Sequence, residues 1–130
     1  MKTILVDAAD TFTVDSPNGF IVDEKMRILL DEYQNQKIIV TNADNQQLTA
    51  FGLTGLPYEL FTLKHSPDKP DPVYFQKLLE KYDLNANDVI YFEHDAEAVE
   101  SATSVDITSF HFNHELRDYN SLKAFIDSNL

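Results

Sequence analysis

The sequence contains no cysteine, no tryptophan and only three glycines among its 130 residues. Without cysteine the chain has no disulfide, no thiolate metal site and no cysteine nucleophile, which is typical of a cytoplasmic protein. Glycine occurs only at Gly19, Gly52 and Gly55, so the sequence has neither a glycine-rich phosphate loop nor a dinucleotide-binding fingerprint. These absences exclude thiol chemistry and the common glycine-rich nucleotide motifs.

Positive charge and long apolar runs are scarce as well. Ten basic residues stand against 22 acidic ones, for a formal net charge of −12. Nucleic-acid binding requires clustered positive charge, so we expect no nucleic-acid partner. No stretch approaches the roughly 18 consecutive apolar residues of a membrane helix, and the apolar opening segment ends at Asp7, too early for a secretory signal. We therefore expect a cytoplasmic protein with no membrane partner.

Short apolar runs alternate with longer amphipathic segments, which is typical of an α/β protein with a parallel sheet. A chain of this length can bury its own core, so residues 1–130 are expected to form a single domain. The apolar runs predict five strands, at residues 3–6, 37–40, 58–63, 89–92 and 106–110. The amphipathic segments predict helices at residues 23–35, 44–51, 72–82, 96–102 and 121–128. The expected fold is a three-layer α/β/α sandwich around a Rossmann-like, five-stranded parallel sheet.

Polar side chains follow four of the expected strands. They are Asp7, Asp10 and Thr11 after the first, Thr41 and Asn42 after the second, Lys64 and Lys69 after the third, and Glu93, His94 and Asp95 after the fourth. In an open parallel sheet, ligands bind in the crevice beyond the carboxyl ends of the strands. We therefore expect these carboxylates, hydroxyls, amide and lysines to converge on one small volume that suits a phosphate and a cation.

The same four segments carry a family resemblance. Residues 4–12, ILVDAADTF, form an apolar run that ends in an aspartate and reaches a threonine four residues later. In residues 38–42, IIVTN, the apolar run ends at Thr41; residues 69–75, KPDPVYF, place a lysine before a proline-led helix; residues 89–95, VIYFEHD, bring acids to a strand end. In this order and spacing they resemble the four motifs of the haloacid dehalogenase-like (HAD) hydrolases, over nearly the whole chain.

The resemblance implies a HAD-like core in which the fifth and fourth strands lie on one side of the first, and the second and third on the other. It implies phosphoryl transfer through an aspartyl-phosphate, with Asp7 as the nucleophile. Thr41 would bind a phosphoryl oxygen, with Asn42 beside it, and Lys69 would neutralise the nucleophile and the phosphate. Lys64 is a competing candidate for the role of Lys69.

The resemblance also implies a magnesium ion. Mg²⁺ would be shared by the Asp7 carboxylate, the backbone carbonyl of Ala9 and an acid of the fourth motif. In that motif His94 stands where the family has a metal-binding aspartate, so Glu93 or Asp95 would have to serve instead. Asp95 is also suited to cap the helix at residues 96–102, and we favour that interpretation.

A second departure concerns catalysis. Family phosphatases have a general acid and base two residues after the nucleophile, and here that position is Ala9. The sequence therefore favours a phosphatase or phosphotransferase of weak or unusual activity. The alternative is an inactive HAD-like domain that binds a phosphorylated ligand or a protein partner through the same crevice.

The chain has no room for a cap domain over this site. About one helix of chain lies between Thr13 and Ile38, and residues 55–57 leave no space for a later insertion. An open site would accept a phosphorylated small molecule or a phosphorylated macromolecule.

Overall fold

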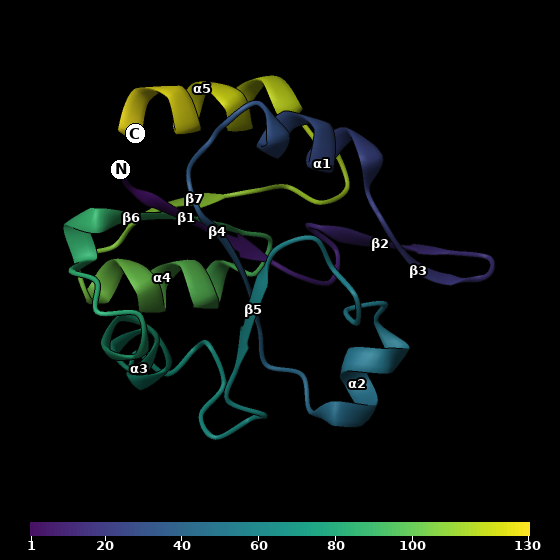
Figure 1. Ribbon diagram of the computed structural model, residues 1–130, viewed down its shortest axis with the longest axis horizontal. Coiled ribbons are helices and arrows are strands. Elements are labelled where there is room, and N and C mark those ends of the chain that lie inside the picture. The colour runs from purple at the N-terminus through teal and green to yellow at the C-terminus, as the bar shows by residue number, and fades with distance from the viewer.

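The five expected strands form one parallel sheet in the computed structural model, which describes residues 1–130 (Figure 1). The strand order is β5-β4-β1-β6-β7, and every neighbouring pair is parallel. The bounds are β1 Thr3–Asp7, β4 Lys37–Thr41, β5 Glu59–Thr62, β6 Val89–Glu93 and β7 Thr108–His111. Both the fold class and the strand order expected from the sequence are confirmed.

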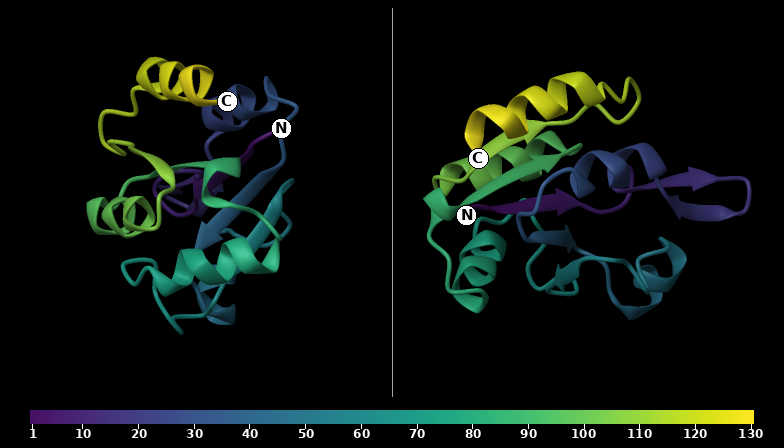
Figure 2. Two further views of the ribbon diagram at one scale, coloured as in Figure 1. Left: turned by 90° about the vertical axis from the view of Figure 1, so that its left-hand side faces the viewer. Right: turned by 45° about the horizontal axis from the view of Figure 1, so that its top comes forward.

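Helices cover both faces of the sheet and complete the three layers (Figures 1 and 2). On one face lie α1 and α5, which span Glu24–Asp31 and Tyr119–Asn129. On the other face lie α3 and α4, which span Val73–Lys81 and Ala96–Ser104. A short helix α2, Asn45–Ala50, follows β4, and a 3₁₀ turn at Ala86–Asp88 precedes β6. None of the helices has the length and hydrophobicity needed to span a bilayer.

The central strand shows why the sheet is buried on both faces. Every residue of β1 is buried, and successive side chains alternate between the two layers. Ile4 and Val6 belong to the core beneath α1 and α5, whereas Leu5 packs with the core beneath α3 and α4. A parallel strand covered by helices on both faces has a continuous run of apolar residues in its sequence, and in β1 that run ends at Asp7.

A β-hairpin lies between β1 and α1, where no strand was expected (Figure 1). Its strands are β2, Thr13–Ser16, and β3, Gly19–Val22, and they pair antiparallel. Gly19 has a φ of +104° in the connecting turn, a conformation that glycine adopts at little cost. With α1, this hairpin makes up all the regular structure between β1 and β4, so no cap domain covers the sheet edge.

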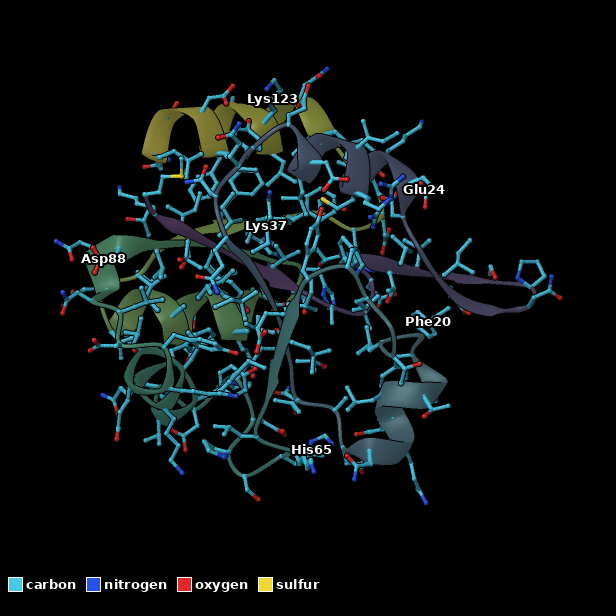
Figure 3. All side chains as sticks on the ribbon, in the orientation of Figure 1. Phe20, Glu24, Lys37, His65, Asp88 and Lys123 are labelled. Atoms are coloured by element: carbon cyan, nitrogen blue, oxygen red, sulfur yellow. The ribbon has the colours of Figure 1, made fainter.

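The hairpin extends beyond the sheet toward α2 (Figure 3). The ring of Phe20 meets the ring of Phe51 with centroids 5.3 Å apart. Gly52 packs so closely that an added Cβ would lie 2.6 Å from the Phe20 carbonyl oxygen. These contacts join the hairpin to the segment that follows α2.

The helix ends differ from the expected ones by two residues or more in three places, one of which is α4, where the helix continues to Ser104 instead of ending at residue 102. Helix α1 ends at Asp31 instead of continuing to residue 35, and α5 begins at Tyr119 with Asp118 as its cap, not at residue 121. The Asp118 side chain accepts a hydrogen bond from the Ser121 backbone N–H. At α3, Pro72 is the cap residue, and the Asp71 side chain before it accepts a hydrogen bond from the Val73 N–H.

Candidate active site

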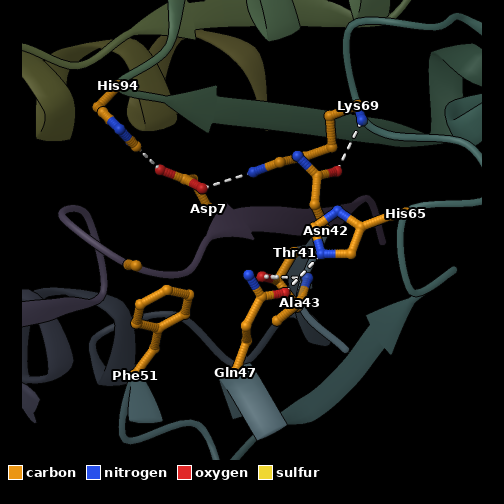
Figure 4. A pocket seen from close by; sticks show the side chains of 10 residues that line it. Asp7, Thr41, Asn42, Ala43, Gln47, Phe51, His65, Lys69 and His94 are labelled. Atoms are coloured by element: carbon orange, nitrogen blue, oxygen red, sulfur yellow. Dashed lines mark hydrogen bonds and ion pairs between the residues drawn. The ribbon is translucent and has the colours of Figure 1, made fainter. Parts of the chain in front are cut away.

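Asp7 is the last residue of β1 and opens onto a pocket at the carboxyl edge of the sheet (Figure 4). The pocket has a volume of about 160 Å³. The Asp7 side chain is only 3% exposed, so the carboxylate lies at the floor of the pocket. The strand brings an ionised group to this depth because the residues before it are anchored in both core layers.

Lys69 is the principal partner of Asp7. Its Nζ lies 2.6 Å from Asp7 Oδ1 and 2.6 Å from Glu93 Oε1, and its side chain is 7% exposed. The Lys69 backbone N–H donates to Asn42 Oδ1 at 2.7 Å, which fixes the loop that carries the lysine. Lys64, the competing candidate, is exposed and does not line the pocket.

Thr41 is the last residue of β4, Asn42 follows it, and both line the pocket beside Lys69. The Thr41 hydroxyl oxygen accepts a hydrogen bond from the Ala43 backbone N–H at 3.2 Å, which leaves the hydroxyl hydrogen to donate to a bound oxygen. Tyr74 on α3 fixes the position of the Thr41 backbone, because its hydroxyl donates a hydrogen bond to the Thr41 carbonyl oxygen at 2.8 Å. The expected convergence of Asp7, Thr41, Asn42 and Lys69 is thus present in the structure.

Thr11 and His94 occupy the other oxygen of Asp7. The Thr11 hydroxyl donates to Asp7 Oδ2 at 2.6 Å, and His94 Nδ1 lies 2.5 Å from the same oxygen. The His94 Nδ1 also lies 3.2 Å from Glu93 Oε2. Because carboxylates only accept hydrogen bonds, Nδ1 must carry a hydrogen in this arrangement.

Glu93 is fully buried at the end of β6, and its carboxylate is held by several donors. Lys69 Nζ and the Tyr91 hydroxyl donate to Oε1, and the Asp95 backbone N–H donates to Oε2 at 3.2 Å. Sequence reasoning did not find the role of Tyr91, because a tyrosine inside an apolar strand has no signal that distinguishes it from core.

The pKa values of these groups follow from their mutual contacts. Burial acts to raise the pKa of Asp7, but the Lys69 ammonium and the hydrogen bond with His94 outweigh it and hold that pKa well below its usual range. Burial would lower the pKa of His94, but hydrogen bonds to Asp7 and Glu93 raise it to about 10. Burial also acts against the charge of Lys69, yet the two carboxylates raise its pKa. Burial and the Asp7 charge raise the pKa of Glu93.

Three nearby residues have other roles. Asp95 caps α4, with its side chain accepting from the Glu97 backbone N–H, which confirms the capping interpretation and places this carboxylate outside the cluster. Ala9 lines the pocket but has no polar side-chain group. Asp10 has a φ of +71° and a side chain that is 44% exposed, with Oδ2 3.8 Å from His94 Nε2. Asp10 therefore does not replace the carboxylate that is missing at Ala9.

The far wall of the pocket is formed by α2 and the loop after β5. Gln47 and Phe51 face it from the helix side, and His65 faces it from the loop (Figure 4). His65 contacts Gln47 Oε1 through Nε2 at 2.5 Å and Asp68 through Nδ1 at 2.7 Å. Sequence reasoning did not include these residues, because none of them directly follows a strand.

The donor set does not fit a magnesium ion. Asp7, Glu93 and His94 each place one possible ligand atom within 4.8 Å of the others. Asp7 Oδ2, however, already accepts from Thr11 and His94, Glu93 Oε1 accepts from Lys69 and Tyr91, and a carboxylate oxygen accepts about two bonds. Glu93 Oε2 accepts from the Asp95 N–H and lies 3.2 Å from His94 Nδ1, and Asp7 Oδ1 faces the Lys69 ammonium at 2.6 Å. The remaining group is an imidazole whose Nδ1 carries hydrogen, and Mg²⁺ prefers oxygen ligands. The Ala9 carbonyl alone would not hold the ion.

Comparison with known proteins identifies the architecture. A HAD family enzyme from Bacteroides thetaiotaomicron, an Asp-to-Ala variant in complex with magnesium and inorganic phosphate, superposes with a TM-score of 0.69 over 85% of this chain and 93% of its own, at 9% identity. This chain has the fold of the HAD hydrolases. The sequence itself matches no protein-family model and no curated protein.

Two further structures extend the likeness. The D,D-heptose 1,7-bisphosphate phosphatase of B. bronchiseptica, complexed with magnesium and phosphate, has a TM-score of 0.67 at 17% identity and covers 92% of this chain and 87% of its own. The core domain of a putative phosphoglycolate phosphatase from Streptococcus pneumoniae has a TM-score of 0.57 at 25% identity and covers 85% and 79%. The HAD-like fold therefore spans most of the chain.

Proposed function

We propose that this chain is a HAD-like hydrolase of the phosphatase type, with Asp7 as the phosphoryl acceptor. One observation carries the proposal: the Asp7 carboxylate lies at the floor of the pocket with Oδ1 2.6 Å from the Lys69 ammonium. Oδ2 is saturated by Thr11 and His94, whereas Oδ1 accepts from Lys69 alone and keeps one lone pair. Oδ1 is therefore the nucleophilic atom.

The chemistry has two displacements at phosphorus. Asp7 Oδ1 attacks the phosphorus of a phosphomonoester, the bond to the ester oxygen breaks, and the leaving group departs with that electron pair. Water then attacks the phosphorus of the aspartyl-phosphate, which frees Asp7 and inorganic phosphate. Lys69 neutralises charge on the transferring oxygens, and the Thr41 hydroxyl and Asn42 amide line the pocket where those oxygens would lie.

Ala9 determines which substrates react. A positioned general acid contributes about 10²–10⁴-fold in rate, and Ala9 has no proton to give. The leaving group must then depart as an anion, which favours aryl and acyl phosphates over alkyl phosphates. Because no cap covers the pocket, the phosphoryl group of a small molecule or of a larger phosphorylated partner would reach Asp7.

The second candidate function is binding without turnover. The observation in its favour is again Ala9, because a site that only binds a phosphorylated ligand or partner has no need of an acid and base. In this case the pocket would bind phosphate through Lys69, Thr41 and Asn42 without forming an aspartyl-phosphate.

The two candidates are separated by measuring phosphate release from p-nitrophenyl phosphate and acetyl phosphate. We expect slow release by the wild type, complete loss in Asp7→Asn, and retention in Asp10→Asn, which removes an exposed acid from the same loop. A folded wild type without turnover on either compound contradicts the enzymatic proposal. Binding alone would be supported if inorganic phosphate still binds and Ala9→Asp with His94→Asp, supplied with magnesium, gains turnover.

A further inference from the structure

His94 lies between the two buried carboxylates of the site. Its Nδ1 is 2.5 Å from Asp7 Oδ2 and 3.2 Å from Glu93 Oε2, and its ring approaches Asp7 from the side opposite Lys69 (Figure 4). A cation that bridges an oxygen of each carboxylate would have to occupy this same space. The imidazole therefore fills the position that a bound metal ion would need. Its Nδ1 hydrogen also uses the carboxylate lone pairs that would bind the ion.

The charges of the buried cluster balance without an added ion. Asp7 and Glu93 contribute two negative charges, and the Lys69 ammonium contributes one positive charge. His94 contributes the second positive charge at neutral pH, because its contacts with the two carboxylates outweigh burial and raise its pKa to about 10. A neutral set is important here because an unpaired buried charge is costly to desolvate. A divalent cation added to this set would leave two excess positive charges in a pocket whose carboxylates are already paired.

The surroundings hold His94 in place from both ends. Its backbone carbonyl lies 2.8 Å from His111 Nε2, and its ring packs edge-on against the ring of His114, with centroids 5.1 Å apart. Its Nε2 faces Asp10, whose Oδ2 is 3.8 Å away. The His94 side chain is 26% exposed, so it is part of the site's wall and not a freely moving surface group.

We propose that the His94 side chain takes the place of a divalent cation, so that this site binds a phosphoryl group without any metal ion. The inference rests on the proposed function, because it concerns the same pocket. In physical terms, the positive charge opposite Lys69 belongs to the His94 side chain and does not come from a metal ion bound from solution.

The charge argument predicts the effect of a single substitution. His94→Asp replaces one positive charge by one negative charge, a change of two units, which equals the charge of one Mg²⁺. The same substitution removes the hydrogen at Asp7 Oδ2 and supplies an oxygen ligand of the kind that Mg²⁺ prefers. His94→Asp is therefore expected to create the metal requirement that the natural chain lacks.

The experiment is calorimetric titration of the metal-free protein with MgCl₂, and separately with ZnCl₂, at neutral pH. We expect no saturable binding of either metal to the wild type, and saturable binding of Mg²⁺ to His94→Asp at an affinity at least about tenfold above the weakest that the titration detects. His114→Asp is the matched control, since it adds an acid beside His94 and leaves the imidazole in place. Saturable Mg²⁺ or Zn²⁺ binding to the wild type would overturn the proposal, as would a folded His94→Asp that binds no Mg²⁺.

A second measurement remains decisive if His94→Asp does not fold. Inorganic phosphate is titrated into the wild type with and without EDTA, and into His94→Asn, which keeps a hydrogen-bond donor but loses the charge. We expect EDTA to leave phosphate affinity unchanged and His94→Asn to weaken it by about tenfold, the effect of one lost charge interaction. Loss of binding in EDTA contradicts the proposal. If the wild type binds no phosphate at all, the proposed function fails, and the metal titration still tests His94 separately.

Discussion

Replacement of Lys69 by methionine tests the buried ion cluster most severely. Lys69→Met keeps the length and the apolar stem of the side chain but removes the ammonium that lies 2.6 Å from both Asp7 and Glu93. Breaking a buried pair by removing one partner typically costs 3–5 kcal/mol, because a charge is left unpaired. His94 still neutralises part of the remaining charge, so we expect a loss of about 3 kcal/mol, or roughly a hundredfold in the ratio of folded to unfolded protein.

Urea unfolding at neutral pH, followed by circular dichroism, measures this loss. The matched control is Lys64→Met, which removes an exposed lysine of the same loop and should change the free energy of unfolding by no more than about 0.5 kcal/mol. An unchanged slope of free energy against urea would show that the two variants unfold from comparable states. A loss below about 1 kcal/mol in Lys69→Met, or an equal loss in both variants, would refute the cluster as described.

Three further predictions concern single groups. The His94 pKa is raised to about 10 from 6.5, so its stabilising contribution is complete below pH 6.5 and is lost as pH rises toward 10; His94→Gln should flatten the profile of unfolding free energy against pH in that window. Asp95→Ala should cost about 1 kcal/mol in thermal unfolding and leave activity intact, because this residue only caps α4. Thr11→Val should cost roughly 1–3 kcal/mol in urea unfolding, because it removes a buried donor to the charged Asp7.

The strands could be predicted because their signal lies in the local sequence, whereas their order was implied only by the resemblance to the HAD hydrolases. Runs such as residues 3–6 and 89–92 are apolar without interruption, and only burial on both faces of a sheet explains such a run. The hairpin at residues 13–22 was missed because its alternation is short and interrupted by Pro17 and Asn18, which resemble an irregular loop. The Ser16-Pro17-Asn18-Gly19 segment is the turn signal that would have found it, because proline at the second position and glycine at the fourth favour a β-turn, and Ser16 pairs with Gly19.

The site could be predicted only in part, for a related reason. Asp7 and Thr41 end strands, and Lys69 lies in the loop after a third strand. Parallel strands carry their carboxyl ends to one edge of the sheet, so the sequence alone predicts that these residues lie together. Which of Glu93, His94 and Asp95 turns inward is decided by strand and helix geometry: Glu93 is the last buried residue of β6, while Asp95 turns to cap α4. Hydrogen bonds between residues far apart in the chain, such as the one from His94 to Asp7, produce no repeating pattern in the sequence from which they could be predicted.

The most direct test of the account is to trap the phosphoryl group on Asp7. The protein is incubated with radiolabelled acetyl phosphate in the presence of EDTA, quenched in acid and treated with hydroxylamine, which cleaves acyl phosphates. We predict a hydroxylamine-labile label on the wild type, the same label on Asp10→Asn, and none on Asp7→Asn. A wild type that stays unlabelled, or an Asp7→Asn protein that is labelled equally, would contradict the assignment of Asp7 as the phosphoryl acceptor.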